Sequence, residues 1–217
     1  MPIEIGFAHC KVGTSEARIS EKTTAEDGKL RISILAWGSL VWDRKDLAIG
    51  ADFAPAGPWL PVEFCRVSRD GCLTLVIDEA FGAPCITYSA LSTFDDLEAA
   101  IENLRIREGM PNREGVGFVA PRHRRQSATA LARHPRAVKT ITEWTSAQGF
   151  DAAIWTALAS NFEEKTHTSF SIEAAIRHLE ALDEETLGSA LRYIRQAPAQ
   201  VKTPVRDAVN IRWPSMQ

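Results

Sequence analysis

The first half of the chain contains short apolar runs that are separated by turn-forming residues, a pattern typical of β-strands. Residues 30–36 are apolar and β-branched and predict a buried strand. The pair Asp70-Gly71 favours a hairpin between two further runs, because both central residues of such a turn must tolerate positive φ. The predicted strands are residues 30–36, 62–68, 72–78, 84–91 and 115–120. Their hairpin connections predict a mainly antiparallel β-barrel or sheet.

Helical patterns follow the strands. Thr93 precedes an apolar stripe with a period of 3.6 residues, and Gly109 stands where a helix of that length would end. After residue 150 the chain reads as helical. The predicted C-terminal helices are residues 151–162, a helix capped by Ser171 and running to Leu182, and a helix capped by Asp183 over residues 184–196. The proline-containing tail from residue 198 is expected to be extended. Strands followed by helices predict an α+β fold rather than a doubly wound sheet.

This order of elements suggests three parts. Residues 1–29 are polar and charged and predict a leader without a packed core. Residues 30–150 form the predicted β-rich body, and residues 151–217 form a helical C-terminal extension packed on it. With 217 residues, of which 45% are hydrophobic, the chain can bury one sizeable core but is short for two full domains.

Charge and composition exclude several classes of function. The formal net charge is −3, so a nucleic-acid partner is not expected. No apolar run approaches the roughly 20 residues of a membrane helix, and the polar start lacks a secretory signal, which makes the cytoplasm the expected compartment. The four cysteines show no metal-binding spacing and are expected to be thiols. No metal or cofactor is predicted, and the sequence does not set the oligomeric state.

Two features carry the candidate chemistry. The segment Trp37-Gly38-Ser39-Leu40 breaks the first strand, and such a turn exposes backbone N–H groups that bind an anion or an oxyanion. Glu108 lies at the C-terminal end of its helix, where the dipole disfavours a negative charge and favours a raised pKa, as suits a general base. The plain alternatives are an ordinary surface turn and a solvated glutamate paired with Arg105 or Arg107.

Other residues are weaker candidates. Arg66 is a candidate anchor for a substrate carboxylate or half of a surface ion pair, and Tyr88 is a candidate hydroxyl donor or a core residue. Asp78-Glu79 is an alternative acid/base pair or a pair of turn residues. The basic stretch over residues 122–136 is either a site for an anionic partner or a solvated face.

The sequence Trp-Gly-Ser-Leu-Val-Trp over residues 37–42 resembles the Tyr-Gly-Ser-Leu-Ile-Trp signature of γ-glutamylcyclotransferase-like proteins. The sequence Leu-Arg-Ile-Arg-Glu-Gly over residues 104–109 resembles the Leu-x-x-Arg-Glu motif of the ChaC-type branch of that superfamily. The similarity covers roughly residues 30–120. Trp37 stands where the family has tyrosine, so the phenolic hydroxyl is missing at this position.

The resemblance implies a cofactor-free enzyme that cyclises a small γ-glutamyl substrate to 5-oxoproline and releases an amine, an amino acid or a dipeptide. It implies that Glu108 is the acid/base and that Trp37, Gly38, Ser39 and Leu40 bind substrate. Two alternatives stay open: a binding protein that holds a small ligand in the same cavity without turnover, and a helical interaction protein built on residues 151–196.

Overall fold

The structure is a computed structural model that describes residues 29–214, so the leader predicted over residues 1–29 lies, apart from Lys29, outside the described residues. The strands are β1 (Ile32–Ala36), β2 (Trp59–Val67), β3 (Leu73–Ile77), β4 (Ala83–Ile86), β5 (Tyr88–Leu91), β6 (Val116–Ala120), β7 (Arg125–Gln126) and β8 (Ala152–Thr156). The α-helices are α1 (Leu97–Arg107), α2 (Ala128–Arg133), α3 (Pro135–Ala147), α4 (Phe162–Thr166), α5 (Ile172–Glu180), α6 (Glu184–Gln196) and α7 (Pro204–Arg212). Short 3-10 turns are η1 (Ser39–Val41), η2 (Arg113–Gly115) and η3 (Pro121–His123).

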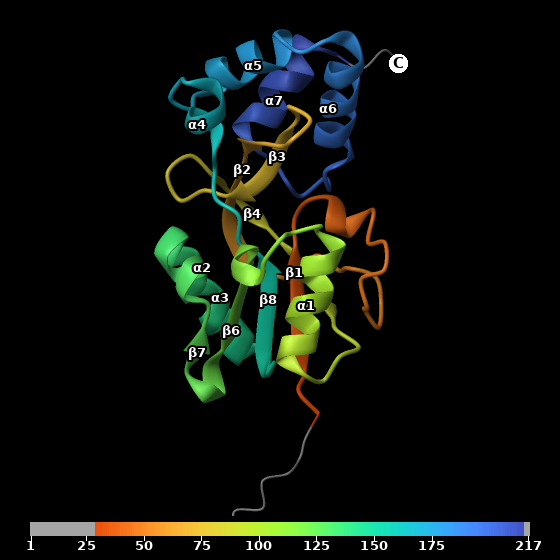
Figure 1. Cartoon of the computed structure of the whole chain (residues 1–217), viewed down its shortest axis with the longest axis vertical. Helices are drawn as coiled ribbons and strands as arrows, with labels where there is room; N and C mark the ends of the chain where they lie inside the picture. Colours follow the sequence, from red (N-terminus) through yellow and green to blue (C-terminus); the bar gives the residue numbers. More distant parts are fainter. Residues whose placement is uncertain (1–28, 215–217) are drawn as a thin grey trace, which may run out of the picture.

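A mixed five-stranded sheet has the order β5-β1-β8-β6-β7, and only β1 and β8 run parallel. Helix α1 packs on one face with Ile32, Ile34 and Ile154, while α3 packs on the other with Leu35 and Trp155 (Figure 1). Side chains of a strand alternate between its two faces, so β1 and β8 contribute to both layers. Both strands are therefore buried almost throughout.

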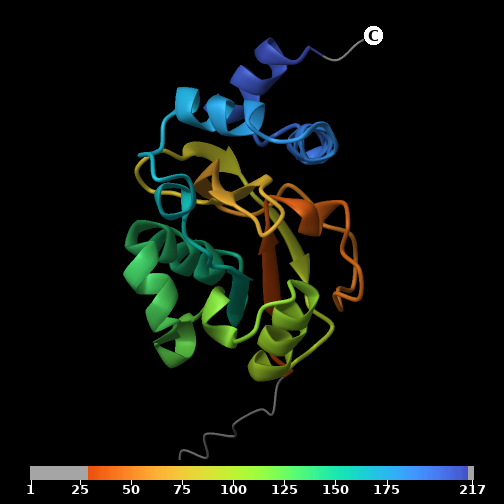
Figure 2. The same cartoon turned by 45° about the horizontal axis from the view of Figure 1, so that its top comes forward.

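An antiparallel three-stranded sheet has the order β3-β2-β4. The four C-terminal helices gather at this end of the molecule (Figures 1 and 2). Helices α4 and α7 pack on β2, α6 packs on β3, and α5 packs on α6 and α7. Phe64 and Leu73 share a core there with Ile194 and Val205. The predicted α+β class is confirmed, but the described residues form two separate sheets and no closed barrel.

The single strand predicted over residues 84–91 is divided between these sheets. Strand β4 pairs with β2, and β5 pairs with β1, with Thr87 between them. The Thr87 hydroxyl and backbone N–H both donate to the carbonyl oxygen of Pro58, at 2.6 and 3.2 Å. These bonds hold the chain where it passes from one sheet to the other.

The prediction of a helix over residues 151–162 is wrong. Residues 152–156 form β8, which lies between β1 and β6 in the centre of the larger sheet. A short apolar run fits either structure, and the open position between two strands decides in favour of the strand. The larger sheet therefore extends past residue 150, where the predicted β-rich body ends.

Two other helices differ from the prediction. Helix α3 (Pro135–Ala147) lies mostly beyond the basic stretch, in residues for which the sequence predicted no element. Helix α7 lies in the proline-containing tail that was expected to be extended. Pro204 is its first residue, where the missing N–H costs no helical hydrogen bond, and the Thr203 hydroxyl accepts from the Arg206 N–H at 3.3 Å.

Local signals in the sequence were more reliable. Gly71 has φ +83° in the turn between β2 and β3, and Gly109 has φ +63° just after α1. Asp183 and Ser171 cap α6 and α5 as predicted. Helix α1 is capped by Asp96 rather than Thr93, through a bond of 2.8 Å from the Ala99 N–H.

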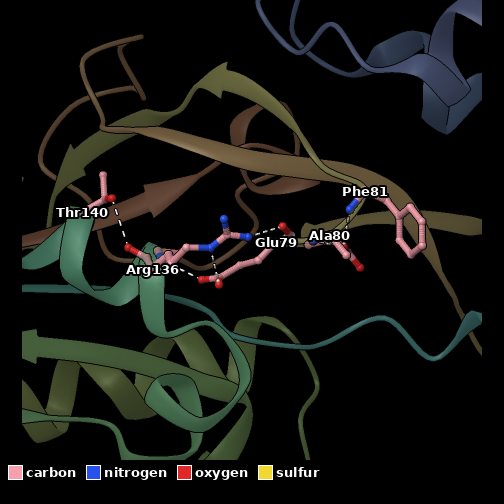
Figure 3. A network of polar contacts seen from close by, with 7 residues as sticks. Glu79, Ala80, Phe81, Arg136 and Thr140 are labelled. Atoms are coloured by element: carbon pink, nitrogen blue, oxygen red, sulfur yellow. Dashed lines mark hydrogen bonds and ion pairs between the residues drawn. The ribbon is translucent and has the colours of Figure 1, made fainter.

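A network of polar contacts joins the two sheets' helices and loops (Figure 3). Glu79, in the loop after β3, accepts from the Ala137 N–H at 2.8 Å and pairs with Arg136 at 3.0 Å. His134, the residue just before α3, does not cap the helix with its own side chain. Glu79 therefore caps α3 from another part of the chain.

Candidate functional site

A cavity of about 50 Å³ lies between β1, α1 and the C-terminal half of the chain. All four residues of the loop Trp37-Gly38-Ser39-Leu40 line it, and so does Glu108. The other lining residues are Leu35, Ala36, Leu75, Thr156 and Tyr193. The two sequence motifs, which are far apart in the chain, thus meet at one cavity.

The loop reaches the cavity because β1 ends at Ala36 and the chain turns into η1. Gly38 stands before η1 and provides no side-chain cap. The first N–H groups of a helical turn have no partner within the turn, so they are donors for a nearby acceptor. A β-carbon on Gly38 would lie 3.1 Å from the Tyr193 hydroxyl, so the loop and α6 are in close contact.

Glu108 is the C-cap residue directly after α1 and is mostly buried, with 18% of its side chain exposed. Its Oε1 accepts from Arg107 Nη1 at 2.6 Å. Burial raises the pKa of Glu108, while the positive charges of Arg107 and Lys45 oppose that change. The carboxyl group is therefore a stronger base than an exposed glutamate.

Arg107 fixes this carboxylate in place. Only 4% of its side chain is exposed, and it also donates to the Asp43 carbonyl oxygen beyond the loop. The ion pair with Arg107 that was the alternative for Glu108 therefore exists, but both of its side chains are largely buried rather than solvated.

Tyr193 contributes a phenol from α6. Its hydroxyl is close to Ser39 and to the Leu75 backbone, and burial raises its pKa to about 12. The ring makes edge contacts with Trp42 and Phe64, at centroid distances of 5.5 and 6.2 Å. The hydroxyl therefore stays protonated at neutral pH and can donate a hydrogen bond into the cavity.

Thr156, at the end of β8, brings a second hydroxyl. Its Oγ1 is buried and has no hydrogen-bond partner among the described residues. Buried polar atoms in native proteins usually have a partner, which is a ligand or water where the protein offers none. The cavity thus has polar groups ready for a small polar molecule.

Two of the predicted site residues lie elsewhere. Arg66, on β2, donates to the Ala159 carbonyl oxygen at 2.7 Å and does not line the cavity. Tyr88, on β5, packs in the core beside α1, and its hydroxyl donates to Gln200. Both side chains make structural contacts away from the cavity, so the structure does not bring either residue to the loop and Glu108, and their substrate-binding role stays a prediction.

The other candidates also have structural partners. Asp78 accepts from the Ala80 and Phe81 N–H groups at 2.9 and 2.8 Å, as a turn residue does. In the basic stretch, Arg122 pairs with Asp151 at 2.7 Å. Arg125, Arg133 and Arg136 bond to Glu98, to the Ala157 carbonyl oxygen and to Glu79. These contacts favour a structural role for Asp78-Glu79 as turn residues and for the basic stretch as a surface with ion pairs.

The sequence did not single out Tyr193 and Thr156 as site residues. Thr156 was assigned to a helix, and Tyr193 to an extension outside the body. The only available signal was that Tyr193 is one of just two tyrosines in the chain. Because both line the cavity, the C-terminal part belongs to the site, which argues against a separate interaction module over residues 151–196.

Over residues 29–214, no group of three or more His, Cys, Asp or Glu side chains is arranged to hold a metal ion. Cys65, Cys72 and Cys85 are free thiols, and Cys10 lies outside the described residues. None of the helices in the described part of the chain is both long and apolar enough to cross a membrane. No protein-family model, curated protein or solved structure matches the chain.

Proposed function

We propose that the chain is a γ-glutamylcyclotransferase-like enzyme that converts a γ-glutamyl group to 5-oxoproline. The observation that supports this most is the shared cavity of Glu108 and the loop Trp37–Leu40. The sequence resemblance assigns these two pieces to one active site, although it says nothing of their distance in space.

The reaction needs one base and no other reactant. The substrate's α-amino nitrogen attacks the γ-carbonyl carbon and forms a new C–N bond, and Glu108 accepts a proton from that nitrogen. The bond from the same carbon to the leaving nitrogen then breaks, and Glu108 returns the proton to it. The protein's main contribution is to hold the flexible chain in its ring-forming shape, since the attack is intramolecular.

The tetrahedral intermediate carries a negative oxygen that must be stabilised. The candidates are the backbone N–H groups after Gly38 and the hydroxyl groups of Ser39 and Tyr193. In a buried site such fixed donors act more strongly than in water. Tyr193 also provides a phenolic hydroxyl beside the loop whose own tyrosine is replaced by Trp37.

Glu108 has the properties that a base in this role requires. Burial raises its pKa, and the positive charge of Arg107 opposes this rise. Because the base must be ionised to accept a proton, kcat is expected to increase as the pH rises through this elevated pKa.

The second candidate function is a binding protein that holds a small polar ligand without turnover. The bond of 2.6 Å between Arg107 and Glu108 favours it, because a paired carboxylate gives up part of its basicity. The modest cavity volume of about 50 Å³ in this state also fits a small ligand.

The test is to incubate the protein with γ-glutamyl amino acids and glutathione and to measure 5-oxoproline by mass spectrometry. Glu108→Gln is expected to lower kcat about a hundredfold or more. The matched control is Glu102→Gln, on the same helix, because Glu102 is exposed and pairs only with Arg105. Full turnover by Glu108→Gln would refute the assignment of Glu108 as the acid/base, and the absence of 5-oxoproline with every substrate would refute the enzyme assignment. Calorimetric binding of a γ-glutamyl compound without any product would support the binding protein instead.

A further inference from the structure

A second, larger depression opens on the outer side of Glu108. Its volume is about 340 Å³, and Glu108 lines both this depression and the inner cavity. The other lining residues are Lys45, Asp46, Asn103, Ile106, Arg107 and Gly109. A substrate whose scissile bond lies at Glu108 would therefore have its γ-glutamyl part inside and its leaving group in the depression.

Lys45 is the positively charged residue of this depression that can bind an anionic group of a substrate. The Arg107 guanidinium is occupied by Glu108, and the neighbouring Arg44 pairs with Asp52 at 2.8 Å. For Lys45, no carboxylate within residues 29–214 lies at ion-pair distance. Its charge nevertheless acts on Glu108, where it lowers the carboxyl pKa. Lys45 and Glu108 thus line the same depression, and the charge of one acts on the other.

The backbone holds Lys45 in an uncommon conformation. Its φ is +50°, in the left-handed region that residues other than glycine seldom adopt. The following residues are tied to α1 by Asn103, whose Oδ1 accepts from the Ala48 N–H at 2.9 Å and whose Nδ2 donates to the Asp46 carbonyl oxygen at 3.3 Å. Strained, anchored residues of this kind are common at binding sites.

The remaining walls are of mixed character. Ile106 is 61% exposed and offers an apolar surface, while Asp46 carries a negative charge. A leaving group with an aliphatic side chain and one carboxylate would match Ile106 and Lys45. A leaving group that is an uncharged alkylamine would leave the ammonium group without a partner.

We propose that Lys45 is a specificity-determining residue that binds the carboxylate of the leaving group. The inference rests on the proposed function and narrows it, because it selects γ-glutamyl amino acids and dipeptides over γ-glutamyl alkylamines. It also assigns the choice of leaving group to the loop between η1 and β2, outside both sequence motifs.

The test compares two substrates that differ only in this carboxylate, γ-glutamyl-alanine and γ-glutamyl-ethylamide. For the wild type, KM is expected to be about fivefold lower for the alanine compound, as an exposed ion pair allows. Lys45→Gln should remove this difference by raising KM for the alanine compound alone, and Lys45→Arg should restore it. The matched control is Arg44→Gln, which removes a neighbouring charge that does not line the depression.

The pH profile separates specificity from a general effect on the base. Loss of the Lys45 charge also raises the pKa of Glu108, so the rising limb of kcat should move to higher pH equally for both substrates. Equal KM values in the wild type, or an equal change in KM for both compounds in Lys45→Gln, would overturn the inference and leave the enzyme assignment intact. If neither compound yields 5-oxoproline, the proposed function fails and this inference fails with it.

Discussion

Gly117→Ala is expected to destabilise the larger sheet, because Trp155 covers Gly117. The two residues are directly opposite each other on β6 and β8. A β-carbon on Gly117 would lie 2.4 to 2.7 Å from three atoms of the indole ring, whereas ordinary contact begins at 3.4 Å. Trp155 has no exposed surface, so its ring has no free space into which it can move.

The size of the effect follows from this crowding. Relieving the closest contact requires a shift of about 1 Å in a packed core. Overpacking of this kind typically costs about 1–3 kcal/mol, and full burial of Trp155 places the expected loss near the upper end. For a chain of this length, about 2–3 kcal/mol corresponds to a decrease in Tm of roughly 5–10 °C.

Urea unfolding followed by tryptophan fluorescence measures this loss. Gly188→Ala is the matched control, since it is the same change in the interior of α6 and its β-carbon meets no atom within 4 Å. It should stabilise the protein by about 0.5–1 kcal/mol, because alanine is the better helix former.

A double mutant tests the contact itself. Trp155→Phe removes the indole atoms that crowd Gly117, so Gly117→Ala should cost at least about 1 kcal/mol less in that background than in the wild type. If Gly117→Ala unfolds at the same urea concentration as the wild type, Trp155 does not cover Gly117, and the placement of β8 beside β6 is wrong.

Three further changes test the site and its support. Glu79→Ala should cost about 1–2 kcal/mol in urea unfolding, since it removes the acceptor for the Ala137 N–H at the start of α3; an unchanged midpoint would show that α3 does not depend on this cap. Tyr193→Phe should cost about 1 kcal/mol and lower the rate of 5-oxoproline formation, because the hydroxyl beside Ser39 is lost; wild-type values of both would remove Tyr193 from the site. Burial raises the pKa of Glu63 above 4.5, so the folded state binds the proton more tightly than the unfolded state. The stability from this group is complete below about pH 4.5 and is lost as the pH rises through the folded pKa. The unfolding free energy of the wild type should therefore fall relative to that of Glu63→Gln as the pH increases, and a difference that does not vary with pH would contradict this sign.

Features set by a few neighbouring residues could be predicted from the sequence. Asp70-Gly71 predicted the hairpin because Gly71 has the positive φ that the turn requires. Asp183 predicted the start of α6 because its side chain accepts from the N–H of Thr186, only three residues away. Such signals depend on backbone angles and on short-range hydrogen bonds, which the local sequence largely determines.

The identity of β8 required the rest of the fold. Residues 152–156 are apolar and give no clear period, so the same segment suits a helix or a strand. Pairing with β1 and β6 satisfies its backbone N–H and C=O groups in the centre of the sheet. Local propensity contains no information about an open position between strands that are distant in the sequence.

The sequence by itself determined which residues of the candidate site are chemically suitable: a glycine-containing loop after a strand and a glutamate at a helix end. Only the tertiary structure decided that Glu108 shares a cavity with that loop and that Tyr193 and Thr156 join them. The tertiary structure also decided that Arg66 and Tyr88 do not line this cavity, because they donate hydrogen bonds to Ala159 and Gln200 elsewhere in the fold. A side chain's chemistry is fixed by its own atoms, whereas its neighbours are fixed by how distant helices and strands pack together.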